Sequence, residues 1–161
     1  MALRASSLIA SVCGIGYAPV ASGTVASGAA VALAFPIIFY GGGWSLVAAS
    51  LIAFGIGVWA CGDHVRATGR EDPSECVIDE LAGQWLACAF AVLPLGLPAA
   101  PITSPGFLLA FALFRLFDIW KPWPVSWADQ KLPGGLGVMA DDMIAGLMAG
   151  LLVLAARYFL L

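Results

Sequence analysis

The sequence is short of charge for a chain of its length. Of its 161 residues only 11% are charged and 61% are hydrophobic, whereas about 25% charge is usual for a soluble domain. A soluble protein of this size could not bury so much apolar surface, so the composition indicates a membrane protein. The formal net charge of -3 excludes a basic nucleic-acid-binding protein, and we expect no nucleic-acid partner.

Histidine is almost absent, and the cysteines are unpaired in sequence. His64 is the one histidine, and we expect it on a surface loop. The four cysteines form no Cys-x-x-Cys pair and have no histidine cluster nearby, which argues against a zinc site or a disulfide framework. No spacing of serine, cysteine and histidine indicates a nucleophile with its base.

Uncharged apolar runs account for much of the chain. A spanning helix needs about 20 such residues, with about 17 as a lower limit. In lipid, only a helix can satisfy all of its backbone hydrogen bonds within one segment. Five runs meet or approach that length: 25–40, 44–61, 81–100, 106–117 and 143–161. The first and fourth are marginal, and the first ends at Gly41-Gly42-Gly43, which predicts a tight turn before the second. We predict a single domain over residues 1–161, an all-α, multi-pass membrane bundle of four to five membrane-embedded helices.

The charges predict the orientation of this bundle. With five crossings and a cytoplasmic N-terminus, residues 62–80 and 118–142 lie on the cytoplasmic side, together with most of the Lys and Arg residues, which agrees with the positive-inside rule. All the acidic residues lie in these two segments: Asp63, Glu71, Asp72, Glu75, Asp79, Glu80, Asp118, Asp129, Asp141 and Asp142. We therefore expect an acidic site on the cytoplasmic face.

One short pattern occurs twice. Residues 79–83 read Asp-Glu-Leu-Ala-Gly and residues 142–146 read Asp-Met-Ile-Ala-Gly, and a second acid, Glu80 or Asp141, stands beside each first aspartate. The glycine four residues after each aspartate lies on the same helical face, so the two helices can approach closely there. This arrangement would gather four carboxylates at one membrane surface.

Two interpretations of these acids are open. Aspartate is a favoured helix N-cap, and acids in a first turn gain about 0.3–1 kcal/mol from the helix dipole. One acid suffices for a cap, however, and two adjacent acids repel, so the doubled pairs favour a site for Mg²⁺, which prefers hard oxygen ligands. We predict four residues as metal ligands and catalytic groups: Asp79, Glu80, Asp141 and Asp142.

A third pattern lies in residues 114–124, FRLFDIWKPWP. Arg115, Asp118 and Lys121 recur every three residues and would share a helical face, until Pro122 ends the helix. Arg and Lys suit a phosphate, and Asp118 could be a catalytic group, a metal ligand or a partner for Arg115. The alternative is an internal ion pair beside membrane-interface anchors. These anchors would be Trp120, Trp123 and Trp127.

The glycine-rich residues 13–27 form a fourth pattern. Backbone of this kind before a helix could hold a phosphate, with Gly23, Thr24 and Ser27 as its candidate contacts. The same residues also make an ordinary turn with an N-cap, so this pattern alone is weak.

Three blocks of the sequence closely resemble the phosphatidylglycerophosphatase A family: GIGYAPVASGTVAS, VIDELAG and FRLFDIWKPWPVSWADQKLPGGLGVMADDMIAG. The resemblance begins near residue 14 and runs to the C-terminus. It implies an all-helical, Mg²⁺-dependent enzyme of the bacterial inner (cytoplasmic) membrane. Such an enzyme removes the terminal phosphate of phosphatidylglycerophosphate to give phosphatidylglycerol, a precursor of cardiolipin.

The resemblance also implies roles for residues. The acidic pairs of the family correspond to Asp79 with Glu80 and Asp141 with Asp142, and its basic block corresponds to Arg115, Asp118 and Lys121. Its first motif, Pro-Gly-Thr-x-Gly-Ser, reads Ser-Gly-Thr-Val-Ala-Ser at residues 22–27, so Thr24 and Ser27 are retained while the proline and second glycine are not.

Two other classes of membrane protein fit the sequence less well. A CDP-alcohol phosphatidyltransferase would carry one dense aspartate run at fixed intervals, which this sequence lacks. A small non-enzymatic transporter would place charge in mid-helix along a path. The sequence leaves open whether water or Asp118 attacks the phosphate, and whether the chain forms a homodimer.

Overall fold

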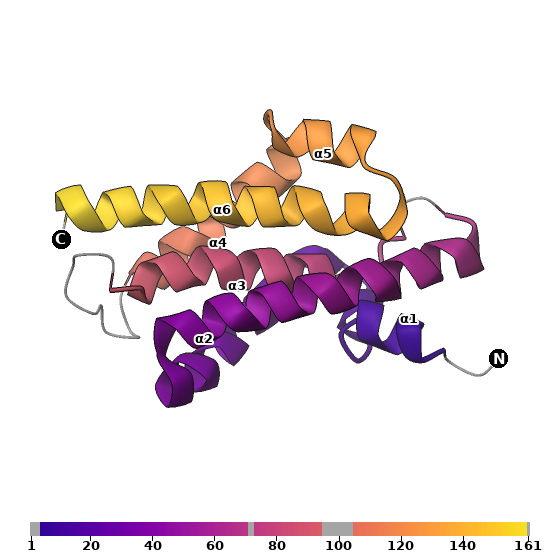
Figure 1. The fold of residues 1–161 in the computed structure, drawn as a ribbon, viewed down its shortest axis with the longest axis horizontal. Coiled ribbons are helices and arrows are strands. Elements are labelled where there is room, and N and C mark those ends of the chain that lie inside the picture. The colour runs from indigo at the N-terminus through magenta and orange to yellow at the C-terminus, as the bar shows by residue number, and fades with distance from the viewer. Residues whose placement is uncertain (1–3, 71–72, 95–104, 161) are drawn as a thin grey trace.

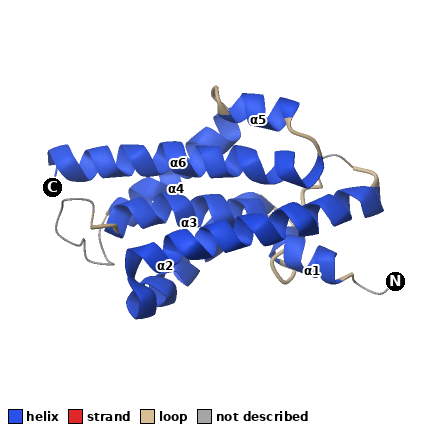
Figure 2. Ribbon diagram, in the orientation of Figure 1, coloured by secondary structure: helices blue, strands red, loops and turns tan. Residues whose placement is uncertain are grey.

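The structure, a computed structural model, describes residues 4–70, 73–94 and 105–160, and these residues form helices and no strand (Figure 2). The helices are α1 (Ala5–Ala10), the 3₁₀ turn η1 (Ile15–Tyr17), α2 (Ser22–Thr68), α3 (Ile78–Val92), α4 (Gly106–Trp120), α5 (Val125–Lys131) and α6 (Gly134–Leu160). The predicted all-α class is confirmed.

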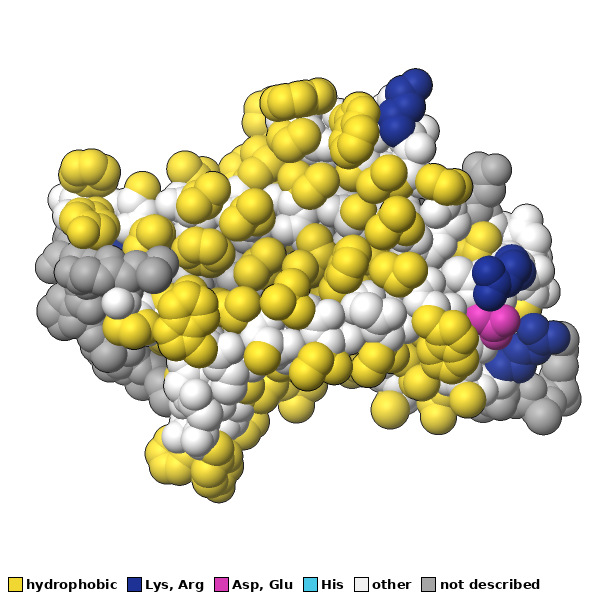
Figure 3. All heavy atoms as spheres, viewed as in Figure 1, with side chains coloured by type: hydrophobic (Ala, Val, Ile, Leu, Met, Phe, Trp, Pro, Cys, Tyr) yellow, Lys and Arg dark blue, Asp and Glu magenta, His cyan; other side chains and the backbone are white. Residues whose placement is uncertain are grey.

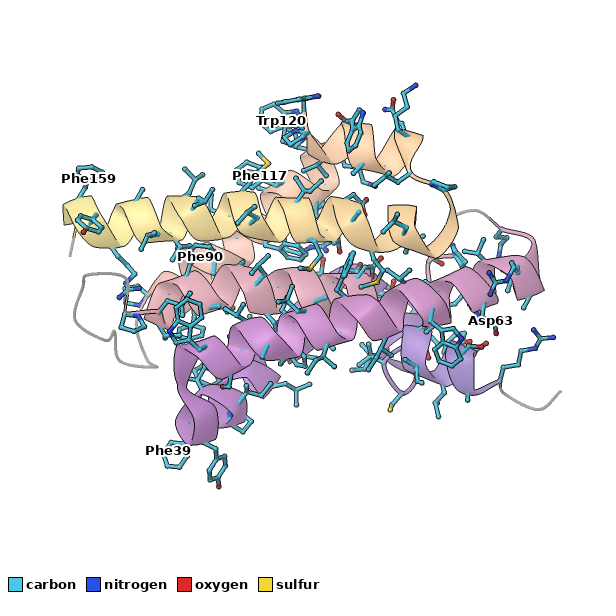
Figure 4. All side chains as sticks on the ribbon, viewed as in Figure 1. Phe39, Asp63, Phe90, Phe117, Trp120 and Phe159 are labelled. Carbon is cyan, nitrogen blue, oxygen red and sulfur yellow. The ribbon has the colours of Figure 1, made fainter. Side chains whose placement is uncertain are left out.

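The long helix α2 is a hairpin of two helices. Its backbone leaves helical geometry at Gly42, where φ is 74°, a region that glycine enters at little cost. At its start the Ser22 hydroxyl donates to the Ser74 carbonyl at 3.0 Å, and near its end His64 bonds to Glu75. Both ends therefore meet the same short segment, and the turn expected between residues 25–40 and 44–61 is confirmed. Figure 4 shows Phe39 beside this turn, at the opposite end of the molecule from Asp63.

Helix α3 occupies the centre of the bundle and packs chiefly against α2 and α6 (Figure 1). A Cβ added to Gly146 would overlap the backbone of Gly83, and one added to Gly83 would meet the Asp142 carbonyl at 2.5 Å. The two repeated Asp-x-x-Ala-Gly segments thus touch backbone to backbone, as the sequence predicted. This contact brings their acidic residues to the same place.

Two described helices, α2 and α6, are long and apolar enough to cross a membrane. The helices α3 and α4 have 15 residues each, and the end of the predicted run 81–100 lies outside the described residues. Much of the visible surface over the helices is hydrophobic, and charged side chains gather near the N-terminal end (Figure 3). A surface of this kind is suited to lipid rather than to water.

The segment 118–142 is largely helical, because it contains α5 and the first turns of α6. Helix α6 begins at Gly134, so Asp141 and Asp142 lie about two turns inside it, and neither can be its N-cap. The capping interpretation of that pair is therefore excluded. Asp79 and Glu80 do lie in the first turn of α3.

His64 was expected on a surface loop, but it is buried inside α2 with 5% exposure. Its Nδ1 lies 2.9 Å from the Ser7 hydroxyl and its Nε2 lies 3.1 Å from Glu75 Oε1. Arg70 also binds the Glu75 carboxylate. The histidine therefore joins α1, α2 and the segment that leads into α3. Its sequence neighbours, which include Asp63 and Arg66, gave no sign of this, because the partners are distant in the chain.

The Glu75 ion pairs predict a pH-dependent stability. Burial alone would raise the pKa of Glu75, but hydrogen bonds with His64 and Arg70 outweigh it and hold the pKa below its ordinary value of 4.5. The carboxylate thus stabilises the fold above that ordinary value, and the contribution disappears as the pH falls through the lowered pKa. We expect Glu75→Gln to lower the free energy of unfolding by about 1–3 kcal/mol at pH 7.

The measurement is the melting temperature of both proteins in detergent from pH 7 to pH 3. The difference between wild type and Glu75→Gln should shrink as the pH falls. A difference that stays constant over this range would show that Glu75 contributes by packing and not by charge.

Candidate active site

The bundle contains an acidic pocket of about 740 Å³. Its walls come from both ends of α2, the segment before α3, the start of α3, the ends of α4 and α5, and the first turns of α6. Its charged lining comprises Asp79, Glu80, Asp118, Lys121, Asp129, Lys131, Asp141 and Asp142. The structure therefore gathers all five predicted catalytic acids, which are separated by up to 63 positions in the chain, around one pocket.

Three of these acids, Asp79, Glu80 and Asp142, form a carboxylate triad. One oxygen from each lies within 4.8 Å of the others. Asp79 and Asp142 are buried, at 9% and 3% exposure. The Glu80 Oε2 atom is buried and has no hydrogen-bond partner among the described residues. Buried carboxylates this close repel one another unless a cation or protons intervene, so the triad fits a divalent cation.

Asp141 is placed differently from the triad. Its Oδ2 atom lies 2.9 Å from the Lys121 ammonium, and its Oδ1 atom accepts the Asp142 backbone N–H at 3.0 Å. The four predicted metal ligands thus divide into a converging triad and a fourth acid that holds a lysine.

Lys121 follows the last residue of α4 in a left-handed conformation, with φ of 47°. Its ammonium lies 2.5 Å from Asp129 as well as close to Asp141. Burial alone would lower the pKa of Lys121, but these two carboxylates raise it above its ordinary value of 10.5, so the ammonium stays charged. The predicted helix end before Pro122 is confirmed. Lys121 nevertheless does not continue the Arg115–Asp118 face, because the chain has turned there.

Arg115 contacts two of the pocket's carboxylates, and its side chain is 15% exposed. Its Nη1 atom is 2.6 Å from Asp118, 3.9 Å from Glu80 and 3.5 Å from the Ser27 hydroxyl. The ion pair between Arg115 and Asp118 was one of the open interpretations, and the structure contains it. The guanidinium therefore fixes one triad member and one neighbouring acid.

The glycine-rich segment meets the site through the first turns of α2. A Cβ on Gly23 would overlap the Glu80 carboxylate and lie 3.2 Å from Arg115 Nη1. Ser27 is buried and donates to the Gly23 carbonyl at 2.8 Å. Thr24 is exposed and does not line the pocket, so of the three predicted phosphate contacts it is the one that the structure separates from the acids.

Gly23→Ala is expected to reduce activity with little loss of stability. The added methyl group collides with the end of a flexible side chain, so the protein can accommodate it by moving the Glu80 carboxylate out of the triad. We expect kcat/KM for phosphate release to fall about 100-fold, because a displacement of about 1 Å at a reacting centre has that cost.

The matched control is Gly28→Ala, one turn further along α2, where an added Cβ meets nothing within 4 Å. It should retain wild-type activity. Equal activity of the two variants would show that Gly23 does not position Glu80.

Sequence reasoning missed Asp129 as part of this site. It forms an ion pair with Lys121, and the residues that follow it, Gln130 to Gly134, build one wall of the pocket. No periodic spacing connects Asp129 with Lys121, because a turn through Pro122 and Pro124 lies between them. The charge of Asp129 was visible in the sequence, but whether its side chain meets Lys121 depended on that turn.

The sequence model described as phosphatidylglycerophosphatase A matches residues 8–157, nearly the whole chain. The chain belongs to the phosphatidylglycerophosphatase A family. It is therefore a phosphatase, and the family supports phosphatidylglycerophosphate as its substrate.

Individual relatives agree with this assignment. A phosphatidylglycerophosphatase A of Escherichia coli (strain K12) is 32% identical over 149 residues, which cover 91% of this chain and 80% of the relative. One from Haemophilus influenzae is 36% identical over 111 residues, covering 68% and 63%. A Bacteroides thetaiotaomicron protein, named as a candidate phosphatidylinositol-3-phosphatase, is 35% identical over 152 residues, covering 90% and 89%. No solved structure matches.

Proposed function

We propose that this phosphatidylglycerophosphatase A family member hydrolyses the terminal phosphomonoester of phosphatidylglycerophosphate in a Mg²⁺-dependent reaction. The oxygen of water bonds to phosphorus and the bond to the glycerol oxygen breaks, which gives phosphatidylglycerol and inorganic phosphate for phospholipid and cardiolipin biosynthesis. One observation carries the proposal. The carboxylate triad converges within 4.8 Å at a pocket of a helical bundle with an apolar surface.

The triad supplies the hard oxygen ligands that Mg²⁺ prefers. Asp79, Glu80 and Asp142 would hold the ion, and the unpartnered Oε2 atom of Glu80 is free to face it. When bound, a divalent cation neutralises phosphate oxygens and thereby lets a dianionic headgroup enter an acidic pocket. Asp141 would contribute less directly, because it binds Lys121.

The remaining charged residues would hold other groups in place and supply positive charge. Arg115 holds Glu80 and Asp118 in place through one guanidinium, and Lys121 carries the permanent positive charge nearest Asp141. Phosphoryl transfer depends mainly on such positioning and on stabilisation of the charge that spreads over the phosphate oxygens. Asp118 borders Asp142 and is already engaged by Arg115 at 2.6 Å, which favours a positioning role over attack on phosphorus.

We place the enzyme in the bacterial inner membrane with its pocket toward the cytoplasm. The exposed apolar side chains over α2, α4 and α6 would contact acyl chains, while the charged end of the bundle would lie among the headgroups. Trp120, Trp123 and Trp127 lie in α4, in α5 or between them and are 70%, 79% and 49% exposed, as expected of anchors at the interface. The basic residues near this end favour the cytoplasmic side.

The test is phosphate release from phosphatidylglycerophosphate by the purified protein in detergent. We expect turnover with Mg²⁺, loss of turnover in EDTA, and recovery when Mg²⁺ is added back. Mg²⁺ should also raise the melting temperature, because a ligand that binds only the folded state stabilises it. Full turnover after exhaustive metal removal would contradict the role of the triad as a metal site.

Phosphatidylinositol 3-phosphate should be tested beside the main substrate, because the Bacteroides relative aligns over 90% of this chain. Preference for that lipid over phosphatidylglycerophosphate would reject the proposed substrate and leave the phosphatase assignment intact.

A further inference from the structure

The charged lining of the pocket is mostly acidic, so it would repel a proposed substrate that is itself strongly negative. Phosphatidylglycerophosphate carries two phosphates, the terminal monoester and the phosphodiester that links glycerol to the lipid. A cation in the triad would balance the monoester. The phosphodiester must then lie further toward the mouth of the pocket, and Asp129 adds a carboxylate to that wall.

Two cationic side chains line the pocket, and only one of them is available for this second phosphate. Lys121 is shared between Asp129 at 2.5 Å and Asp141 at 2.9 Å, so its charge is already balanced. Lys131 is exposed and has no carboxylate within ion-pair distance among the described residues. It is therefore the one lining cation whose charge the described part of the protein leaves uncompensated.

The backbone around Lys131 is held firmly. Lys131 is the last residue of α5, and the Leu132 N–H donates to the Ala128 carbonyl at 3.1 Å. Gly137 packs directly on the Leu132 carbonyl, and Gly135 packs on the backbone of α2 at Gly62. The connection between α5 and α6 thus fixes the backbone position of Lys131, while the flexible side chain of this lysine can still reach a ligand.

The position of Lys131 also suits the lipid phosphodiester. Trp127 lies one turn earlier on the same face of α5 and is 49% exposed. A half-exposed tryptophan is typical of the headgroup level of a bilayer, which is where phosphodiesters lie. Lysine binds phosphate as a point charge and needs no fixed orientation to do so.

We infer that Lys131 binds the phosphodiester of the substrate and thereby selects lipids with two phosphates over lipids with a terminal monoester alone. The inference rests on the proposed function. It adds that the site distinguishes phosphatidylglycerophosphate from phosphatidic acid by a contact remote from the bond that breaks. Lys131 is thus a specificity-determining residue, outside the reacting centre.

The test compares two lipids with four proteins in mixed micelles. The proteins are the wild type, Lys131→Ala, Lys131→Arg and the control Arg66→Ala, which removes an exposed basic residue that does not line the pocket. Phosphatidylglycerophosphate is assayed as substrate. Phosphatidic acid is assayed as substrate or, where it is not turned over, as a competitive inhibitor.

We expect Lys131→Ala to raise KM for phosphatidylglycerophosphate about 10-fold, the effect of losing one hydrogen bond to a charged group. KM or the inhibition constant for phosphatidic acid should change less than 2-fold. Lys131→Arg should recover most of the selectivity, and Arg66→Ala should keep the wild-type ratio.

Equal changes for both lipids would overturn the inference, because they would show a general effect of surface charge. No change for either lipid would overturn it as well. A wild type that fails to hydrolyse phosphatidylglycerophosphate but hydrolyses another phosphomonoester lipid would instead reject the proposed function, so the two failures are distinguishable.

Discussion

Asp142→Asn is expected to reduce phosphate release by about three orders of magnitude while leaving the fold intact. Asp142 is buried at 3% exposure about two turns inside α6, so it cannot be a helix cap, and its neighbours in space are other acids. Asparagine has nearly the same size but supplies no negative charge to a metal ion. We expect kcat/KM to fall by about 10³-fold, comparable to the loss of a preorganised group that stabilises the transition state.

Stability should respond in the opposite way. Without Mg²⁺ the melting temperature of Asp142→Asn should be unchanged or higher, because the substitution relieves repulsion with Asp79 and Glu80. The stabilisation that Mg²⁺ gives to the wild type should shrink. The control is Asp63→Asn, the same chemical change at an acid outside the pocket, which should keep wild-type activity. A near wild-type rate for Asp142→Asn would remove the triad from the mechanism.

Arg115→Met is expected to give the second large effect. One guanidinium serves Asp118, Glu80 and Ser27, and its removal leaves two acids beside the pocket without their cation. Removing one member of a buried ion pair costs about 3–5 kcal/mol, so the melting temperature should fall clearly. We expect activity to fall at least about 100-fold, because Glu80 would lose its fixed position.

Arg115→Lys separates charge from geometry. A lysine restores the positive charge and much of the stability, but its shorter side chain cannot place the ammonium where the Nη1 atom of Arg115 meets all three partners. It should therefore melt near the wild type and remain strongly impaired in turnover. Wild-type turnover of Arg115→Lys would show that only the charge at this position matters.

Much of the candidate site could be predicted from the sequence because it depends on local spacing. The repeated Asp-x-x-Ala-Gly pattern encodes both an acid and the glycine that lets a neighbouring helix approach, and the structure places Gly83 against Gly146 as expected. The i, i+3 spacing of Arg115 and Asp118 likewise encodes their ion pair within one helix turn. Such relations need only the geometry of a helix.

The places where the sequence misled are those where distant segments meet or where a helix start has no clear signal. The last apolar run was predicted to begin at residue 143, yet α6 begins at Gly134. Its first turns can form there because Gly135 and Gly137 allow close packing on α2 and on the preceding turn. His64 was expected at the surface, since no nearby residue could show that Ser7 and Glu75 would enclose it.

By itself the sequence determined the all-helical class, the apolar runs, the turn at Gly42 and the acids of the site, because composition and helical periodicity are properties of neighbouring residues. Only the tertiary structure decided how those acids divide their roles. Asp79, Glu80 and Asp142 converge, while the turn after α4 carries Lys121 to Asp141 and Asp129. The physical reason is that charges interact through space at a few ångströms, and the packing of α3 on α6 sets these distances.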